Sequence, residues 1–443
     1  MKYFIYCTVP GLRQQDLAQM PNLKELISNG AQQQLTTSFP GVTWPAQASM
    51  LTGKLANQHG VIANGFYWRN QQEVEMWTAW NEKIEAPQIW DLLHDISPDI
   101  KSLAWFPMLS KGSGADYICM PKPVHNPDGS ESLWCYTQPQ KYYGELLESI
   151  GHFPLQHFWG PLANIKSSQW ILESALKAIS DFKPQFSYIY IPHLDYAAQK
   201  LGPNSPAAFQ AVTELDEVLG NMINGVHESL GKENVVWIIA SEYVITEVDH
   251  VTYPNRILRE AGLLNVSVQE DGEHLDLDSP AWTLVDHQLG HVFVQNHCQE
   301  TVQKVVEVFS SQPGIAEVLV GDQRSKYGLD HERSGDVVII SAANSWQAYY
   351  WWLDDIKAPS FAHTVDIHRK PGYDPVELHF DMQTKSIPLD ATLIKGSHGA
   401  PVKDDNQRGV ILSNCPVILK DRDWQDTELC EHLVNTISDV QNL

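Results

Sequence analysis

Short apolar runs that alternate with amphipathic stretches constrain the fold of this chain most. The runs have the length and the β-branched and aromatic content of buried strands. They are Tyr3–Val9, Ser102–Phe106, Phe186–Pro192, Val235–Ala240 and Val337–Ser341. Helical periodicity is clearest at Leu17–Ser28, Ser167–Phe182 and Pro206–Leu230. Strands that alternate with helices pair in parallel and are covered on both faces. The sequence therefore predicts an α/β fold built on a mainly parallel sheet.

A smaller unit is expected within this pattern. His291–Val294 and Ile315–Val320 are strand candidates on either side of a helical stretch, Glu300–Ser311. We assign this β-α-β unit to an inserted cap at approximately residues 245–330. No linker-like segment separates it from the rest. We therefore expect one domain over residues 1–443 that carries a small α+β cap.

Charge and cysteine content limit the partners of the chain. Its 30 Lys and Arg against 54 Asp and Glu give a net charge of −24, which argues against a nucleic-acid polymer or an anionic membrane as partner. No apolar run is long enough to span a bilayer, and the N-terminus does not resemble a signal peptide. Six dispersed cysteines without a CxxC pair are typical of free thiols, so we expect a cytoplasmic protein. The sequence indicates no oligomeric state.

A small anionic metabolite remains compatible with this charge. The positive charge that it needs can come from a metal ion or from a helix N-terminus. The carboxylates that follow predicted strands are therefore of interest. Asp195 follows Phe186–Pro192, and Glu242 follows Val235–Ala240. Ligands of open α/β sheets bind beyond the carboxyl ends of strands, although strand ends are also often polar for solvation alone.

Two further residues are site candidates from their local sequence. Pro45 suits the first turn of a helix, which places Thr43 at or just before a helix N-terminus, where its hydroxyl faces unpaired N–H groups. The same position suits an ordinary N-cap threonine, and the two roles are compatible. His398 lies in a loop between Gly396 and Gly399. This setting is equally consistent with a functional and a structural role.

In their order and spacing, these residues resemble the alkaline phosphatase superfamily, and within it the type I phosphodiesterase/nucleotide pyrophosphatase branch. The resemblance extends from residue 3 to about residue 400. Phe39–Pro45 is similar to the family's nucleophile motif, with Thr43 as the nucleophile. Asn64 closes a segment whose final Asn contacts the phosphoryl oxygen in the family. Asp195–Pro203 and Gly396–Gly399 are similar to metal-ligand motifs. The resemblance implies an alkaline phosphatase-like core and a hydrolase of small phosphate esters or phosphonates.

The departures from the family pattern fall on its metal ligands. The family binds two Zn²⁺ ions with three Asp and three His. Here Pro10 stands at the first Asp, Gln199 at one His, and Glu242-Tyr243 at an Asp-His pair. Proline has no ligating side chain, and glutamine and tyrosine are uncommon zinc ligands. The resemblance therefore does not support an ordinary two-zinc centre.

Three hypotheses follow for the site. In the first, Asp195, Glu242 and His398 bind one divalent ion, Zn²⁺, Mn²⁺ or Fe²⁺, and Thr43 remains the nucleophile. In the second, other residues rebuild the site, and Arg369-Lys370 supply positive charge. The candidates are His193, Asp286, His287, Asp366, His368, Arg369 and Lys370. In the third, the chain is a catalytically degenerate member without a metal that binds a metabolite or a protein partner. The retention of Thr43, Asn64 and His398 argues against this third hypothesis.

Overall fold

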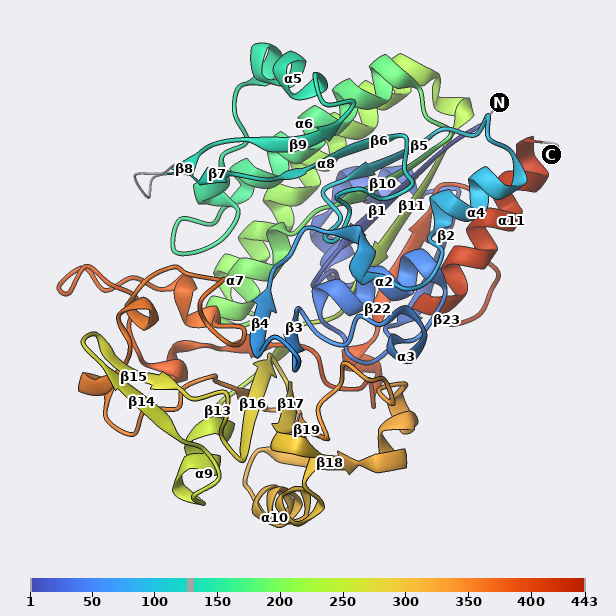
Figure 1. Cartoon of the computed structure of the whole chain (residues 1–443). Coiled ribbons are helices and arrows are strands. Elements are labelled where there is room, and N and C mark those ends of the chain that lie inside the picture. The colour runs from blue at the N-terminus through green and yellow to red at the C-terminus, as the bar shows by residue number, and fades with distance from the viewer. Residues whose placement is uncertain (1, 126–130, 442–443) are drawn as a thin grey trace.

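A nine-stranded sheet forms the larger part of the molecule (Figure 1). The structure is a computed structural model and describes residues 2–125 and 131–441. The strand order is β23-β2-β22-β11-β1-β10-β5-β6-β9. The strands are β1 (Tyr3–Val9), β2 (Ala31–Thr36), β5 (Ser102–Trp105), β6 (Tyr117–Pro121), β9 (Cys135–Gln138), β10 (Phe186–Tyr190), β11 (Val235–Ser241), β22 (Gly409–Ser413) and β23 (Trp424–Gln425). The five central strands, from β11 to β6, run parallel. The predicted α/β class with a mainly parallel sheet is confirmed.

Helices cover both faces of this sheet. On one face α6 (Ile165–Phe182) packs against α8 (Pro206–Leu230), and on the other α11 (Leu429–Gln441) packs against α4 (Ile89–Ile96) (Figure 1). The remaining helices of this part are α1 (Pro21–Leu26), α2 (Thr43–Thr52), α3 (Ala56–His59), α5 (Tyr142–Ile150) and α7 (His193–Leu201). The helix predicted at Leu17–Ser28 is broken, because Pro21 starts a new helix after a 3₁₀ turn at Gln14–Gln19. Within the described ranges, no helix has the length and apolar content that crossing a membrane requires.

A second, four-stranded sheet lies below the first in Figure 1. Its order is β16-β17-β19-β18, and all its neighbours are antiparallel. The strands are β16 (Ala281–Asp286), β17 (Leu289–Val294), β18 (Ile315–Val320) and β19 (Val337–Ser341), and α10 (Gln299–Ser310) follows β17. The predicted strand-helix-strand order is therefore present, with β19 between the two strands. The cap boundary at approximately 245–330 stays a prediction.

The assignment of Val337–Ser341 to the same parallel sheet as the other apolar runs is wrong. This segment is β19 of the antiparallel second sheet. All five of its residues are buried, so its sequence is continuously apolar and does not reveal which sheet it joins. The run Tyr349-Tyr350-Trp351-Trp352 packs into the core of this second sheet.

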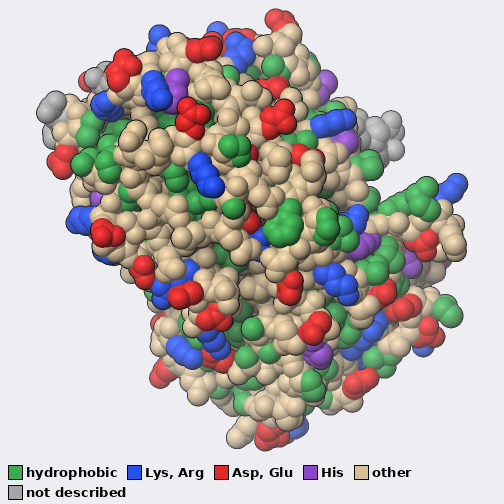
Figure 2. Space-filling view, turned by 180° about the vertical axis from the view of Figure 1, so that it is seen from behind, with side chains coloured by type: hydrophobic (Ala, Val, Ile, Leu, Met, Phe, Trp, Pro, Cys, Tyr) green, Lys and Arg blue, Asp and Glu red, His purple; other side chains and the backbone are tan. Residues whose placement is uncertain are grey.

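Shorter pairs and one helix complete the fold. They are β3 (Gly65–Trp68) with β4 (Glu73–Met76), β7 (Val124–His125) with β8 (Glu131–Ser132), β12 (Thr246–Glu247) with β21 (Gly396–Ser397), β13 (His250–Thr252) with β20 (Ser345–Gln347), β14 (Val266–Gln269) with β15 (Gly272–Leu275), and α9 (Pro254–Glu260). Figure 2 shows acidic and basic side chains interspersed over the back of the molecule. Among the described residues on that face, no continuous basic surface is seen.

Two structural parts meet at the carboxyl ends of the central strands. The amino end of β1 lies at the far side of the large sheet, so its carboxyl end points toward the second sheet (Figure 1). The turn between β16 and β17 reaches this edge, where the Gln288 N–H donates to the carbonyl of His398 over 3.1 Å. Residues from both sheets therefore share one site.

Candidate functional site

Thr43 is the first residue of α2 and is 6% exposed. Its Oγ1 lies 3.1 Å from the hydroxyl of Tyr243. The N-cap position belongs to Val42, and no side chain caps the helix. The interpretation of Thr43 as an N-cap is therefore wrong, because its hydroxyl points to another side chain and not back to its own helix. Next to it, the Trp44 N–H donates to Asn64 Oδ1 over 2.9 Å.

Asn64 joins this helix start to the β16–β17 turn. Its backbone N–H donates to Asp286 Oδ2 over 2.7 Å, and its Nδ2 donates to Asp286 Oδ1 over 3.1 Å. Asp286 Oδ1 also accepts from His287 Nδ1 over 2.6 Å. All three residues are buried. Burial raises the pKa of Asp286 to about 6, so the carboxylate is still largely ionised at neutral pH.

His398 and Asp195 face each other. His398 Nδ1 donates to the carbonyl of Gly41 over 2.8 Å, and its Nε2 lies 3.8 Å from Asp195 Oδ1. Both of these facing atoms are buried and have no hydrogen-bond partner among the described residues. Burial lowers the pKa of His398 well below its usual value and raises the pKa of Asp195 to about 7. The imidazole is therefore neutral at neutral pH.

Glu242 directly follows the last residue of β11, Ser241, and is fully buried. Its Oε1 accepts from Thr8 Oγ1 over 2.7 Å and from Gln47 Nε2 over 3.0 Å, while its Oε2 has no partner among the described residues. Burial raises the pKa of this carboxyl to about 8. Oε1 is thus already hydrogen-bonded to neighbouring side chains.

Four aromatic rings form a continuous column through the site. Tyr243 stacks on His398 at 3.7 Å between ring centroids, His398 lies 3.9 Å from His287, and His287 stacks on Tyr373 at 3.7 Å. The Tyr373 hydroxyl donates to Gln199 Oε1 over 2.7 Å. Tyr243 and Gln199, which stand at ligand positions of the family pattern, therefore bond to other protein groups.

This donor set does not fit a two-ion centre. Pro10 offers no ligand, and Tyr243 and Gln199 are engaged as described. Over residues 2–125 and 131–441, no three His, Cys, Asp or Glu side chains are already grouped closely enough to hold an ion. The facing atoms of Asp195 and His398 do suit one shared ion. Two donors at about 2.1 Å from one Zn²⁺ lie at most about 4.2 Å apart, and the observed separation is 3.8 Å.

A cavity of about 710 Å³ opens above these residues. Thr43, Asp195 and His287 contribute polar groups to its wall. Its aromatic lining consists of Trp77, Phe158, Trp159, Tyr190, Tyr196 and Tyr373. In the described part of the chain, no Lys or Arg side chain lines it. The wall therefore favours apolar and aromatic groups and supplies no fixed positive charge.

The expectation that Arg369 and Lys370 bring positive charge to the site is wrong. Lys370 is buried, and its Nζ lies 2.8 Å from a carboxylate oxygen of Asp374 and 2.6 Å from one of Glu377. Arg369 is exposed and pairs with Asp366 at 2.5 Å. Both charges are therefore neutralised within their own segment. Asp366 and His368 do line the cavity, so part of this cluster reaches the site.

Other residues singled out in the sequence have different surroundings from those expected. His193 turns to α8, where its Nε2 lies 3.0 Å from Glu214 Oε2. Trp44 and Trp68 both pack against Phe66. The sequence did not reveal the aromatic wall with Tyr373, because these residues are scattered from position 77 to 373 and share no local motif.

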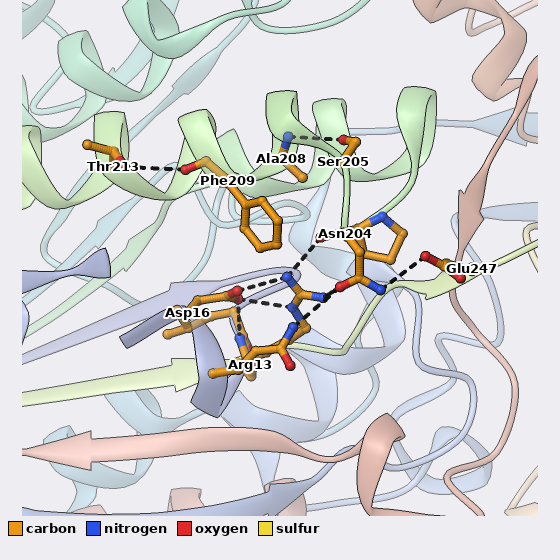
Figure 3. A network of polar contacts seen from close by, with 12 residues as sticks. Arg13, Asp16, Asn204, Ser205, Ala208, Phe209, Thr213 and Glu247 are labelled. Atoms are coloured by element: carbon orange, nitrogen blue, oxygen red, sulfur yellow. Dashed lines mark hydrogen bonds and ion pairs between the residues drawn. The ribbon is translucent and has the colours of Figure 1, made fainter. Parts of the chain in front are cut away.

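Arg13 ties together two of the motif-bearing loops (Figure 3). It follows the turn after β1, and its guanidinium donates to Asp16 Oδ1, Asn204 Oδ1 and the Pro203 carbonyl, each over 2.8 Å. Asn204 in turn donates to Glu247 over 3.0 Å. Asp195 lies in the first turn of α7. The contacts of Arg13 with Pro203 and Asn204 fix the segment that follows α7 to the end of β1.

Comparisons with known proteins agree with this architecture. The family model for type I phosphodiesterase/nucleotide pyrophosphatase matches residues 7–374. An uncharacterised pyrophosphatase/phosphodiesterase of Schizosaccharomyces pombe is 25% identical over 252 residues, which are 56% of this chain and 44% of that protein. The match thus spans less than half the length of this relative.

Solved structures share the fold along nearly the whole chain. Murine ectonucleotide pyrophosphatase/phosphodiesterase 5 superposes with a TM-score of 0.63 at 15% identity, covering 99% of this chain and 95% of that one. Phosphonoacetate hydrolase from Sinorhizobium meliloti, in complex with phosphonoacetate, gives 0.65 at 14% identity, covering 98% and 96%. An inactive form of the murine protein in complex with AMP gives 0.62 at 14% identity, covering 99% and 95%.

Proposed function

The chain belongs to the type I phosphodiesterase/nucleotide pyrophosphatase family, and we propose that it hydrolyses a small phosphate ester or phosphonate with Thr43 as nucleophile and one divalent ion. One observation carries the proposal. Asp195 Oδ1 and His398 Nε2 are both buried, both without a hydrogen-bond partner among the described residues, and 3.8 Å apart. Buried polar atoms are nearly always partnered, so two facing buried atoms without a partner support the proposal of a shared cation.

The charge balance of the site supports the same ligand. Asp195 is a buried carboxyl in the cavity wall, and that wall holds no Lys or Arg among the described residues. An anionic substrate next to this carboxyl needs a positive charge from elsewhere. Asp195 and His398 would hold a divalent ion, Zn²⁺ or Mn²⁺, which when bound would supply Lewis-acid polarisation of a phosphoryl oxygen.

The chain's own residues position the reaction. Tyr243 holds the Thr43 hydroxyl, and because burial keeps the pKa of Tyr243 well above its usual value, the phenol stays protonated. The start of α2 adds the positive end of the helix dipole. Thr43 Oγ1 forms a bond to phosphorus as the ester bond breaks, and the hydroxyl proton leaves with the departing alcohol. Water then cleaves the phosphothreonine and restores Thr43.

The substrate is proposed to be a small anionic metabolite whose leaving group is apolar or aromatic. The aromatic wall, with Trp77 and Trp159, supports this class. AMP and phosphonoacetate occupy the related solved structures, which is in keeping with a small phosphorus-containing ligand. The six cysteines are all unpaired, which supports a proposed cytoplasmic location.

A second candidate is a binding protein without turnover. It is favoured by the surroundings of Thr43, because its hydroxyl lies within hydrogen-bond distance of a protonated phenol, and a phenol in this state is not a base. In that case the cavity binds a metabolite through its aromatic wall, and no ion is needed.

Hydrolysis of bis-p-nitrophenyl phosphate, measured together with metal content, distinguishes the hydrolase from the binding protein. We expect ion-dependent turnover that Thr43→Ala abolishes while the bound ion is retained. Thr78→Ala, which changes a threonine elsewhere in the cavity wall, is the matched control and should remain active. Ligand-dependent melting shifts without any turnover would favour the binding protein.

A further inference from the structure

We propose that Glu377 is a positioning residue that holds two segments of the cavity wall at a fixed spacing and thereby selects ligands with a flat aromatic group. The inference rests on the proposed function, because it concerns the specificity of that same cavity. Glu377 does not line the cavity. It lies behind the wall in the 3₁₀ turn Pro375–Leu378, and its side chain is 1% exposed.

Two segments that are far apart in the sequence form much of the cavity wall. Segment 155–159 contributes Leu155, Gln156, Phe158 and Trp159, and segment 365–368 contributes all four of its residues. The first holds only the 3₁₀ turn Leu155–His157, and the second lies in a stretch without helix or strand. Between these two described segments there is no backbone hydrogen bond. Their spacing therefore depends on side chains.

Glu377 bonds to both segments, one through each carboxylate oxygen. Its Oε2 accepts from Trp159 Nε1 over 2.6 Å, and its Oε1 accepts from the backbone N–H of Asp366 over 2.9 Å. Oε1 also lies 2.6 Å from Nζ of Lys370. Hydrogen bonds to an ionised group are roughly twice as strong as those between neutral groups. Three donors thus fix the carboxylate, and the carboxylate fixes the two segments.

The same two segments also pack tightly next to these bonds. Gly160 follows Trp159 with a φ of +91°, a conformation that favours glycine. A side chain at this position would place its Cβ 3.2 Å from Val365 Cγ2. The backbone beside Trp159 therefore lies close against the second segment, and the indole has a defined position relative to it.

The fixed indole belongs to an aromatic face of the cavity. The ring of Trp159 lies 5.4 Å from that of Tyr373, and Tyr373 lies 6.1 Å from Trp77 between ring centroids. All three rings line the cavity. An aromatic group of a ligand that packs on such a ring gains about 2- to 10-fold in affinity beyond its burial. This gain requires that the ring stay in place, which is the role of Glu377.

The test is binding of phenylphosphonate and methylphosphonate to the full chain, measured by calorimetry with Zn²⁺ present. The two probes carry the same anionic group and differ only in phenyl against methyl. Glu377→Gln retains the size of the side chain and removes its charge. Asp374→Asn is the matched control, because Asp374 also pairs with Lys370, at 2.8 Å, but within the described chain it has no bond to Trp159 or Asp366.

We expect the wild type to bind phenylphosphonate about 2- to 10-fold more tightly than methylphosphonate. Glu377→Gln should bring this ratio close to one and leave the affinity for methylphosphonate unchanged, whereas Asp374→Asn should keep the ratio. Trp159→Phe retains an aromatic ring without the N–H and should lower the ratio as well. Combined with Glu377→Gln it should add no further loss, because both changes remove the same bond.

The role of Glu377 is overturned by a wild type that binds neither probe or both equally, or by a Glu377→Gln that keeps the ratio. An equal loss in Asp374→Asn also overturns it, because the charge balance of Lys370 is then the cause. If Glu377→Gln does not fold, Trp159→Phe decides, and an unchanged ratio there overturns the role. A wild type that prefers phenylphosphonate but hydrolyses no bis-p-nitrophenyl phosphate supports this role and overturns the proposed hydrolase.

Discussion

Replacing Glu242 with Gln should make the metal-free protein more stable, and increasingly so as the pH rises. The carboxyl is fully buried, and its pKa rises from 4.5 to about 8 because burial penalises the charged form. In Glu242→Gln the amide oxygen can still accept from Thr8 and Gln47. The amide nitrogen then takes the place of Oε2, which has no partner among the described residues.

The sign and size follow from proton linkage. A carboxyl with a raised folded-state pKa contributes stability that is fully present below pH 4.5 and is lost as the pH rises toward 8. At about 1.4 kcal/mol for each pH unit, this loss reaches on the order of 4 kcal/mol. Gln cannot ionise, so Glu242→Gln does not lose this stability as the pH rises. The stability difference should be near zero at pH 4.5 and a few kcal/mol in favour of Glu242→Gln at pH 8.

Urea unfolding in EDTA, followed by tryptophan fluorescence at several pH values between 4.5 and 8, measures this difference. Asp249→Asn, at a carboxyl in the loop before β13, is a matched control and should show no comparable growth with pH. If the difference between Glu242→Gln and the wild type stays constant over this range, Glu242 does not ionise against a burial penalty, and the reasoning is refuted.

Three further changes test other parts of the structure. Arg13→Met leaves the buried Asp16 without its ion pair and should lower the free energy of unfolding by roughly 2–4 kcal/mol, whereas an unchanged urea midpoint would show that the contact in Figure 3 stabilises nothing. Lys370→Met leaves two buried carboxylates unpaired, with an expected loss of about 3–5 kcal/mol in thermal melts; a smaller loss at pH 4 than at pH 7 would identify charge as the cause. His368→Ala, in the cavity wall, should raise KM for bis-p-nitrophenyl phosphate and leave metal content unchanged, and a loss of the ion would make it a ligand instead.

The fold could be predicted because its signals are local. Buried parallel strands are continuously apolar, and four of the five predicted runs lie in the large sheet. Val337–Ser341 has the same local signature but pairs in the antiparallel second sheet. Strand pairing depends on which residues meet in space, and a continuously apolar run carries no alternation from which its partners can be recognised.

The site could be predicted only in part. Thr43, Asn64, Asp195 and His398 stand in motifs, and the structure brings them to one edge of the sheet. The bonds of Tyr243 with Thr43 and of Tyr373 with Gln199 join residues 200 and 174 positions apart. No sequence pattern of a single chain reveals such pairs. The roles expected for the charges of Arg369 and Lys370 were likewise wrong, since only the structure shows the carboxylates that neutralise them.

Metal analysis of the purified wild-type chain beside Asp195→Asn and His398→Gln is the decisive measurement. A single ion held between these two side chains predicts about one divalent ion for each wild-type chain and a loss of that ion in both variants. Two ions per chain, no ion at all, or one ion that survives both substitutions would contradict it.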